Sequence, residues 1–245
     1  MINYKIELCY DGTKYYGWEK QPNVDTIQGK LEDVLTRMTG SSVEVIGAGR
    51  TDAGVHARKM VANAHMDTDL EPKAIRDYMN RYLPEDICIM DVAIASDRFH
   101  ARYNATGKLY TYTFYVGETK PVFNRRYMTV LEALPDVEAM KKAAAYLVGK
   151  HDFRSFCSNT RMKKSTVRVV DRIEIVRKKD CLYLNFHGTG FLRSMVRIMT
   201  GTLLEIGKGN IRPEAMKSIL EGCDRQLAGP TAPPQGLALV EVDYS

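Results

Sequence analysis

One short loop of the sequence combines an arginine and an aspartate between glycines. The segment GAGRTDAGVHA, Gly47 to Ala57, places Asp52 two residues after Arg50 and directly follows SSVEVI. Glycines let the backbone turn sharply and bring a substrate close to the main chain. In an extended segment Arg50 and Asp52 project to the same side, where the guanidinium keeps the carboxylate ionised and oriented. Such a carboxylate, with no evident base or metal beside it, suits covalent nucleophilic catalysis.

Three other interpretations of this loop compete with catalysis. A dinucleotide-binding loop needs G-x-G-x-x-G before a helix, whereas here the third glycine is Gly54 and a strand-like segment follows. A metal site built on Asp52, His56 and His65 is disfavoured, because Asp-x3-His brings two ligands together only on a helix, which the glycines oppose. A structural Arg–Asp pair in a tight turn remains open on residue types alone.

Two basic segments are candidates for contacts with an anionic partner. The stretch RSFCSNTRMKKSTVR is either a solvated loop or a phosphate-facing surface, and its cations are Arg154, Arg161, Lys163, Lys164 and Arg168. The loop DGTKYYGW combines Lys14 with three aromatic residues. It could grip an RNA backbone, although Trp18 is equally a candidate core anchor.

An aromatic strand and a basic helix face complete the candidates. Tyr110 opens a run of alternating aromatic residues in GKLYTYTFYV, and the next two, Tyr112 and Phe114, are expected to belong to the core. Arg193 and Arg197 lie four residues apart on a predicted helix and therefore share a face. Surface phosphate contact and plain solvation are the alternatives for both arginines.

Hydrophobic periodicity predicts the elements that position these side chains. Helices are predicted after a capping box of Asp25 and Gln28, from Pro72, after Asp136, from about Phe191 to Ile206, and from Pro213. The strands are NYKIELCY, SSVEVIG, MVANAHM, DICIMDVAIA, GKLYTYTFYV, TVRVVDRIEIVRK, CLYLNFHG and LALVEVDY. The second half nearly repeats the order of the first, so we expect an α+β fold of two similar lobes sharing a long antiparallel-rich mixed sheet, with helices on one face. The lobes are residues 1–104 and 105–245.

The length, composition and charge of the chain indicate a globular protein. The chain has 245 residues with 44% hydrophobic and 27% charged side chains, and its net charge is a modest +5. These values are ordinary for a globular protein. No apolar run reaches the ~18 residues that span a bilayer, and the start is no signal peptide, so a cytoplasmic protein without membrane contact is expected. The five cysteines are widely spaced without C-x-x-C, which argues against disulfides or structural zinc.

Several separated blocks resemble one known family. GRTDAGVHA is similar to the catalytic motif of the TruA-type tRNA pseudouridine synthases, and YDGTKYYGWEKQPN with TIQGKLEDVL resembles the start of that family. FHARYNATGKLYTYTFY, Phe99 to Tyr115, resembles its second motif, and GTGFLRSMVRIMTGTLLEIGKG, Gly188 to Gly209, its third. The similarity covers nearly the whole chain in the right order, which is far more specific than any single block.

The resemblance implies a fold, an activity and partners. It implies two α+β halves around a long mixed sheet with a central basic cleft, forming one continuous catalytic unit. It implies isomerisation of uridine to pseudouridine in the anticodon stem-loop of tRNA, at tRNA positions 38, 39 and 40, without cofactor or metal. It also implies a homodimer in which each tRNA touches both subunits.

The resemblance also assigns roles to residues. Asp52 attacks covalently, either at C1′ of the ribose or at C6 of the base. Arg50 keeps the aspartate charged or enters the RNA stack as the base leaves it. Arg197 pairs with the catalytic aspartate. Tyr110 stacks on the target base and could take the C5 proton, and Phe191 walls the pocket or belongs to the core.

The remaining candidates are expected mainly to bind substrate. His100 and Arg102 are expected near the nucleotide, with His100 as a less favoured general base. The expected contacts to the RNA backbone are Lys14, Arg58, Lys108, Arg161, Lys163 and Lys164. Two alternatives stay open: an RNA-binding or RNA-chaperone paralogue without turnover, and a synthase with another uridine target. The intact set of Arg50, Asp52, Tyr110 and Arg197 argues against the first.

Overall fold

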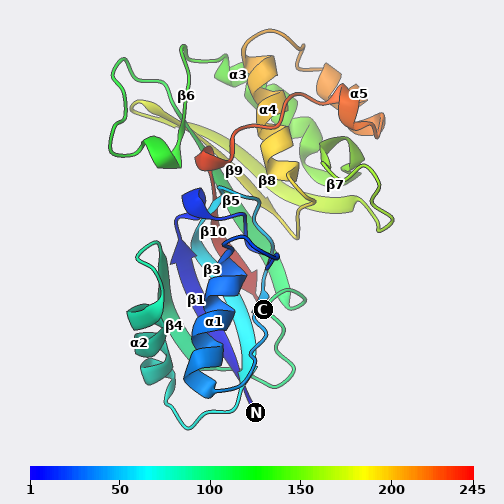
Figure 1. The fold of residues 1–245 in the computed structure, drawn as a ribbon. Helices are drawn as coiled ribbons and strands as arrows, with labels where there is room; N and C mark the ends of the chain where they lie inside the picture. Colours follow the sequence, from blue (N-terminus) through cyan, green and yellow to red (C-terminus); the bar gives the residue numbers. More distant parts are fainter. The chain divides into compact units, whose positions relative to one another are not determined.

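The computed structural model describes all 245 residues as a mixed α+β protein with a large, mostly antiparallel sheet (Figure 1). This confirms the predicted fold class. Contacts divide the chain into two compact units. The first unit comprises Met1–Thr106 together with Ala238–Ser245, and the second comprises Gly107–Leu237.

The sheet of the first unit has the order β4-β1-β3-β10. Strand β1 (Ile2–Tyr10) pairs antiparallel with β3 (His56–Met66) and with β4 (Ile87–Ile94). The last strand, β10 (Leu237–Tyr244), pairs in parallel with β3. Alternate residues of β1 are buried, as its pattern predicts: Tyr4, Ile6, Leu8 and Tyr10.

The predicted strand SSVEVIG is largely an extended loop. Of this segment, only the part Ile46–Gly47 forms a strand, β2, which pairs with β3. Val43 and Val45 are nevertheless buried, and their backbone N–H groups donate to side chains of a helix, at 3.2 Å to Thr36 Oγ1 and 3.1 Å to Glu32 Oε1. Because these donors are satisfied by side chains, the segment is held in place without a strand partner.

Two helices contact each other and pack with the sheet of the first unit, α1 (Ile27–Thr39) and α2 (Pro72–Tyr82). The predicted capping box at Asp25 is wrong. Thr26 is the N-cap and accepts from Gly29 N at 3.2 Å, whereas the Asp25 carboxylate lies 2.6 Å from Lys30 Nζ. The hydroxyl of Thr26 can reach the free N–H groups of the first turn, and the ion pair draws Asp25 away from them.

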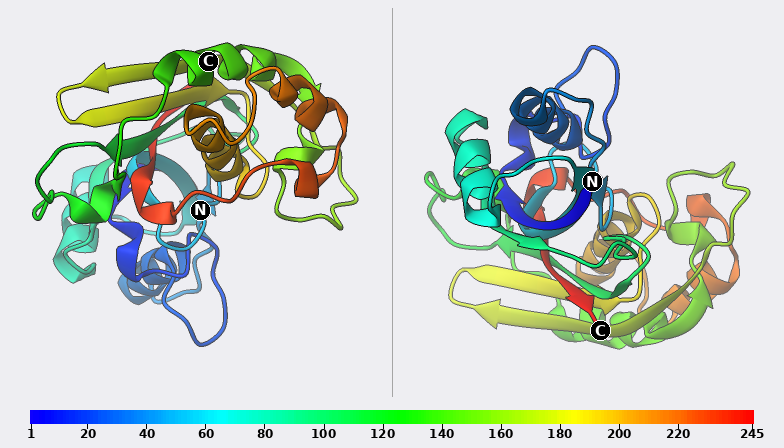
Figure 2. Two further views of the ribbon diagram at one scale, coloured as in Figure 1. Left: turned by 90° about the horizontal axis from the view of Figure 1, so that it is seen from above. Right: turned by 90° about the horizontal axis from the view of Figure 1, so that it is seen from below.

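The sheet of the second unit has the order β5-β9-β8-β7. Its strands are β5 (Ala105–Tyr115), β9 (Cys181–Gly188), β8 (Val167–Lys178) and β7 (Gly149–Asp152), all antiparallel to their neighbours. Figure 2 shows β8 and β9 side by side as a long hairpin. The short β6 (Thr129–Val130) runs parallel to β5.

Three helices belong to the second unit: α3 (Val137–Ala144), α4 (Met195–Gly207) and α5 (Ala215–Glu221). Short 3-10 turns complete the chain at Gly12–Lys14, Arg125–Tyr127, Ala145–Leu147, Arg154–Phe156, Arg225–Leu227 and Pro234–Gly236. Helix α4 starts four residues later than predicted, because Ser194 has a left-handed φ of 58° that a helix cannot include. Most of α4 is buried, so this helix forms the core of its unit.

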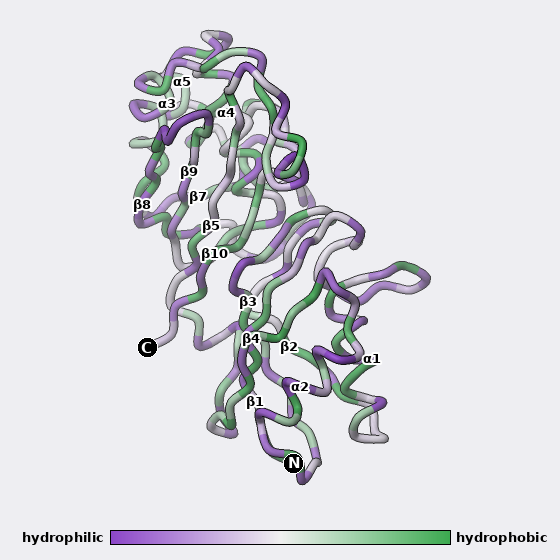
Figure 3. The backbone as a smooth tube through the Cα atoms, turned by 90° about the vertical axis from the view of Figure 1, so that its left-hand side faces the viewer, coloured by the Kyte–Doolittle hydropathy of each residue, from purple (hydrophilic) through white to green (hydrophobic).

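None of the helices has the length and the hydrophobicity that a membrane span needs. The longest helices, α1 and α4, have 13 residues. Figure 3 shows polar and apolar residues interleaved along the strands and helices, as expected where one face of each element is buried.

Candidate active site

The Asp52 loop is fixed by hydrogen bonds on both sides of the aspartate. Trp18 N donates to the carbonyl oxygen of Thr51 at 3.1 Å, and the Thr51 hydroxyl bonds to Tyr10 OH at 2.9 Å. Gly54 N donates to the carbonyl oxygen of Tyr15 at 3.3 Å. Asp52 itself is partly exposed. The loop therefore presents a carboxylate at the surface of the unit on a backbone that cannot easily shift.

The turn that carries Asp52 requires its glycine. Val55 N donates to the carbonyl oxygen of Asp52 at 3.1 Å, which closes a four-residue turn with Gly54 at its third position. Gly54 has φ of 76°, a left-handed value that side chains disfavour. Sequence reasoning had given the glycines this conformational role.

The loop after β1, which we call the supporting loop, contains the lysine and the aromatic residues noted in the sequence. Tyr15 and Trp18 are buried, which confirms Trp18 as a core anchor. A Cβ at Gly17 would stand 2.7 Å from the Thr51 carbonyl oxygen, and one at Gly12 would overlap the Val55 carbonyl oxygen. The glycine spacing in DGTKYYGW was the signal in the sequence for this close approach.

Gly12→Ala is expected to damage both stability and the Asp52 loop. The added methyl must push Val55 away, which costs about 1–3 kcal/mol of the free energy of unfolding and displaces the turn at Asp52. A displacement of about 1 Å lowers a catalytic rate by about 100-fold. Chemical denaturation and turnover measured on the same preparation test this. Gly190→Ala is the stability control, because a methyl there meets nothing within 4 Å. Equal stability of the two variants would contradict the role of Gly12.

Arg50 has a partner outside the loop. Its guanidinium lies 2.7 Å from Glu19 Oε1, and the two side chains are 61% and 50% exposed. An exposed ion pair of this kind contributes only about 0–1 kcal/mol, so it can open easily. Glu19 had no role in the sequence-based hypothesis that Arg50 acts on Asp52 directly.

The other candidates of the first unit lie on its surface. Lys14 is 66% exposed, with Nζ 3.5 Å from Asp86 Oδ2, and Arg58 is exposed on β3. Arg102 is exposed too, and its backbone N–H donates to His100 Nδ1 at 3.2 Å. Tyr103 N donates to the same nitrogen at 3.3 Å. His100 therefore closes a turn through Nδ1, which leaves Nε2 as the ring atom that could meet a substrate.

His56 holds the supporting loop against β3. The residue is buried, and its Nδ1 accepts a hydrogen bond from Gly12 N at 3.0 Å. His56 therefore has a structural role in this unit. His65, which was considered as a metal ligand with it, is exposed further along the same strand.

Tyr110 and Phe191 come together in the second unit. Tyr110 lies on β5 opposite Phe186 and is 7% exposed. Phe191, in the turn before α4, packs edge to face on the Tyr110 ring, with ring centroids 5.3 Å apart and an interplanar angle of 83°. The next two aromatic residues of the strand, Tyr112 and Phe114, are fully buried as predicted.

Arg197 is anchored by backbone hydrogen bonds. Its Nε donates to the carbonyl oxygen of Ala232 at 2.8 Å, and Ala232 N donates to the Arg197 carbonyl oxygen at 3.1 Å. Gly201, one turn further along α4, leaves room for the carbonyl oxygen of Pro230 in the same segment. The guanidinium is thereby oriented by a segment 35 residues away. Arg193 precedes the helix, so the prediction that it shares a helix face with Arg197 is wrong.

Tyr112 is a buried tyrosine whose hydroxyl is held by two hydrogen bonds. Its hydroxyl bonds to the Pro233 carbonyl oxygen at 2.8 Å and to Thr129 Oγ1 at 2.7 Å. Burial raises the pKa of Tyr112 to about 12, although the Thr129 hydrogen bond and the charge of Arg197 oppose this. Burial also raises the pKa of Tyr15 and of Tyr244.

We expect the protein to lose stability as the pH rises above 10. The unfolded chain gives up its tyrosine protons near pH 10 and the folded chain does so later, so alkali favours unfolding. Tyr112 alone contributes about 1–3 kcal/mol of this loss between pH 10 and 12. Denaturant titrations at pH 9 and pH 11 measure it. Tyr112→Phe should shrink the pH dependence and the exposed Tyr16→Phe should not; equal pH dependence in both variants would contradict the assignment.

The basic candidates of the second unit lie on a loop and a strand. Arg161, Lys163 and Lys164 are exposed between the 3-10 turn Arg154–Phe156 and β8. Lys108 is half-buried on β5, opposite Gly188 of β9. The central part of this stretch is therefore an exposed loop, whose cations are open to solvent and to a large anionic partner alike.

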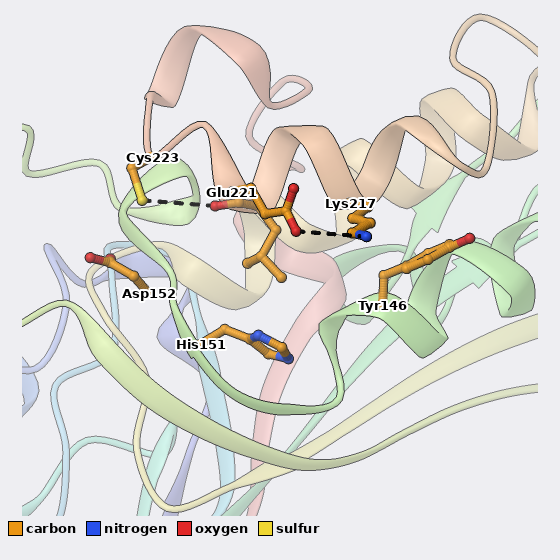
Figure 4. Close-up of a pocket in the computed structure, with 7 residues that line it drawn as sticks. Tyr146, His151, Asp152, Lys217, Glu221 and Cys223 are labelled. Carbon is orange, nitrogen blue, oxygen red and sulfur yellow. Dashed lines mark hydrogen bonds and ion pairs between the residues drawn. The ribbon is translucent and has the colours of Figure 1, made fainter.

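A pocket of about 470 Å³ opens elsewhere in the second unit (Figure 4). His151 and Asp152 of β7 face Lys217 and Glu221 of α5 across it, and Cys223 lies at its edge. None of its lining residues is among the candidates from the sequence. The pocket is therefore separate from the residues considered for catalysis.

The two sets of residues have different chemical capacities. The first unit supplies a partly exposed carboxylate, Asp52, on a rigid loop. The second supplies a phenol in an aromatic pair, Tyr110 with Phe191, and an oriented guanidinium, Arg197. Side chains of these types can each act on a nucleotide: a carboxylate can attack it, a phenol can stack on the base, and a guanidinium can neutralise negative charge.

Comparison with known proteins defines the class. The family model described as tRNA pseudouridine synthase matches residues 9–104 and 143–245. Curated relatives cover the whole chain. "tRNA pseudouridine synthase A" of Syntrophotalea carbinolica is 43% identical over 98% of this chain and 96% of its own length. "tRNA pseudouridine synthase A 2" is 40% identical in Clostridium perfringens and 42% identical in Bacillus cereus, with both chains fully covered.

The chain belongs to the tRNA pseudouridine synthase family, and so to the isomerases. The match includes the Asp52 loop and the segment with Phe191 and Arg197, whereas Tyr110 falls between the two matched ranges. A solved structure of a Cbf5-Nop10-Gar1 complex is 12% identical with a TM-score of 0.35, covering 96% of this chain and 57% of that one. That likeness is too low to support an argument.

Proposed function

We propose that this protein isomerises uridine to pseudouridine in the anticodon stem-loop of tRNA, at positions 38, 39 and 40, with Asp52 as the covalent nucleophile. The observation that carries the proposal is the Asp52 loop. A partly exposed carboxylate stands on a turn that Val55 N closes and Gly54 N ties to the loop after β1, inside the range that the family model matches. A rigid carboxylate open to a large substrate is what covalent attack on RNA requires.

The reaction is balanced without any co-reactant. A carboxylate oxygen of Asp52 bonds to C1′ of the ribose or to C6 of the base, and the N1–C1′ bond breaks. The base turns, C5 bonds to C1′, the bond to Asp52 breaks, and the proton on C5 leaves to water while N1 gains one. A uridine in a stem must first leave the base stack for these atoms to be reached.

Aromatic and basic residues assist in this proposal. Tyr110 stacks on the target base and takes the C5 proton, and Phe191 supports its ring. Arg197 supplies the cation that keeps the aspartate ionised. Arg50 leaves its exposed pair with Glu19 and enters the RNA stack in place of the base. His100, through Nε2, and Arg102 contact the nucleotide from the turn after Phe99.

Exposed cations bind the RNA backbone in this proposal, namely Lys14, Arg58, Lys108, Arg161, Lys163 and Lys164. Three of these cations, Arg161, Lys163 and Lys164, lie in one exposed loop, the basic loop. Replacing all three with glutamine should weaken tRNA binding and make it less dependent on salt. Each phosphate contact contributes about 0.7–0.9 to the magnitude of the slope of log K against log salt, so this magnitude should fall by up to about 2.7 in the triple glutamine variant. Filter binding at several salt concentrations measures the slope.

The matched control removes three cations that form ion pairs on the exposed surface of α3 and α5: Lys141→Gln, Lys142→Gln and Lys217→Gln. This variant has the same net charge as the basic-loop variant. An equal loss of slope in both would mean that only net charge matters, and would contradict a phosphate contact at the basic loop.

The assembly and location follow the same proposal. The protein acts in the cytoplasm as a homodimer, with each tRNA touching both subunits. Residues 1–104 and 105–245 act as one continuous catalytic unit with a central basic cleft.

The test uses tRNA transcripts labelled with tritium at C5 of uridine. Each isomerisation releases one tritium to water, and the product positions are then mapped. Release with pseudouridine at positions 38, 39 or 40 supports the proposal. Release with product at other positions would identify another uridine target, and salt-sensitive tRNA binding with no release would favour an RNA-binding paralogue.

A further inference from the structure

Ser158 joins the basic loop to the turn that starts α4. Its backbone N–H donates to the carbonyl oxygen of Arg193 at 3.1 Å. Its hydroxyl lies 3.3 Å from the same oxygen and 3.1 Å from Ser194 Oγ. Residues 35 and 36 positions apart in the sequence are thus bound at one point.

The turn that Ser158 contacts is not stabilised by a side-chain capping hydrogen bond to α4. Ser194 is the N-cap of α4 but makes no side-chain hydrogen bond to the first turn of the helix. Its left-handed backbone, with φ of 58° and ψ of 10°, costs about 1–2 kcal/mol for a residue other than glycine. Such a conformation persists only when surrounding contacts hold it, and Ser158 supplies contacts of this kind.

Arg197 follows that turn closely. It is the third residue of α4, and its far side is fixed by the two hydrogen bonds with Ala232. The position of the guanidinium therefore depends both on Ala232 and on the direction of the first helical turn, which carries the Arg197 backbone. A change of backbone at Ser194, directly before this turn, would alter the direction in which the turn carries the Arg197 side chain.

On its other side, Ser158 begins the exposed part of the basic loop. The preceding residues are fixed, because Phe156 and Cys157 are buried and Ser155 Oγ donates to the Ile219 carbonyl oxygen at 2.6 Å. The loop ends at Thr166, which is buried and donates to Asp152 Oδ1 at 2.6 Å. Between these anchors lie the exposed cations Arg161, Lys163 and Lys164.

We propose that Ser158 is a positioning residue, which couples phosphate binding by the basic loop to the orientation of Arg197 through the Arg193–Ser194 turn. The inference rests on the proposed function, because that function assigns the loop cations to RNA and Arg197 to the reacting nucleotide. When the loop closes on phosphates, Ser158 holds the turn in its left-handed form, and the guanidinium is fixed.

The first test separates binding from the chemical step. Ser158→Ala should lower the single-turnover rate of tritium release by about 5–10-fold at saturating enzyme, with the tRNA dissociation constant changed by less than about twofold. Ser158→Thr keeps the hydroxyl and should restore the rate. Ser165→Ala removes another hydroxyl from the same loop, one that accepts from Val167 N, and should change neither quantity. An unchanged rate in Ser158→Ala would overturn the proposal.

The second test does not depend on turnover. Amide hydrogen exchange of the peptide 191–199 is followed with and without a tRNA transcript. Binding should slow exchange in the parent and not in Ser158→Ala. If tRNA binds without tritium release, the proposed function fails while this comparison still reports on the coupling. Equal slowing in both proteins, or none in the parent, would overturn it.

Discussion

Asp52→Asn should abolish release of tritium from uridine-labelled tRNA, with a loss of at least about 1,000-fold in the single-turnover rate. An amide has the shape of a carboxylate but cannot form the covalent bond to the nucleotide, and loss of a nucleophile costs several factors of ten. Asp52 is partly exposed, and the turn around it is held by backbone hydrogen bonds that the substitution leaves intact. The fold and the affinity for tRNA should therefore change little.

The experiment needs two further variants. Asp33→Asn removes a carboxylate from the exposed side of α1 and should keep the parental rate, which controls for net charge. Asp52→Ala excludes residual activity from conversion of asparagine back to aspartate during preparation. Retention of a tenth or more of the parental rate by Asp52→Ala would remove Asp52 from the role of nucleophile.

Tyr110→Phe is expected to have the second largest effect, a loss of about 100- to 10,000-fold in the single-turnover rate. This is the range over which a positioned proton-transfer group contributes, and only the hydroxyl is removed. The ring remains to pack edge to face on Phe191, so stability and base stacking should be preserved. Rapid quenching of tritium release at saturating enzyme measures the rate.

Tyr110→Leu separates the two roles given to this residue. If the hydroxyl carries the C5 proton, Tyr110→Phe and Tyr110→Leu should both lower the single-turnover rate, and Tyr110→Leu should also weaken tRNA binding. If Tyr110 only stacks, Tyr110→Phe keeps the rate and Tyr110→Leu loses it. Tyr146→Phe, a change in the remote pocket of the same unit, should behave as the parent.

Local sequence patterns predicted many of the strands and helices, the fold class and the family. Alternation in NYKIELCY and the apolar stripe that follows it predicted β1 and α1, because side-chain periodicity depends only on the backbone geometry of each element. The order of strands and helices predicted the mixed α+β class. The residues of GRTDAGVHA and three further blocks were enough to indicate the family, since several motifs in order rarely coincide by chance.

Short-range rules failed where a side chain had a competing partner. Asp25 and Thr26 were both acceptable N-caps by residue type, and the ion pair with Lys30 decided between them. SSVEVIG has the composition of a strand, but side chains of α1 satisfied its backbone first. The start of α4 was displaced by the left-handed Ser194, which nothing in its sequence neighbourhood signals.

Only the tertiary structure decided the contacts between segments far apart in the sequence. The parallel pairing of β10 with β3, the pair of Arg50 with Glu19 and the anchoring of Arg197 by Ala232 have no local signature. Each depends on how loops close and which surfaces pack, and that free energy belongs to the whole chain. The sequence by itself thus predicted which residues are candidates for chemistry, and the fold decided what holds those residues in place.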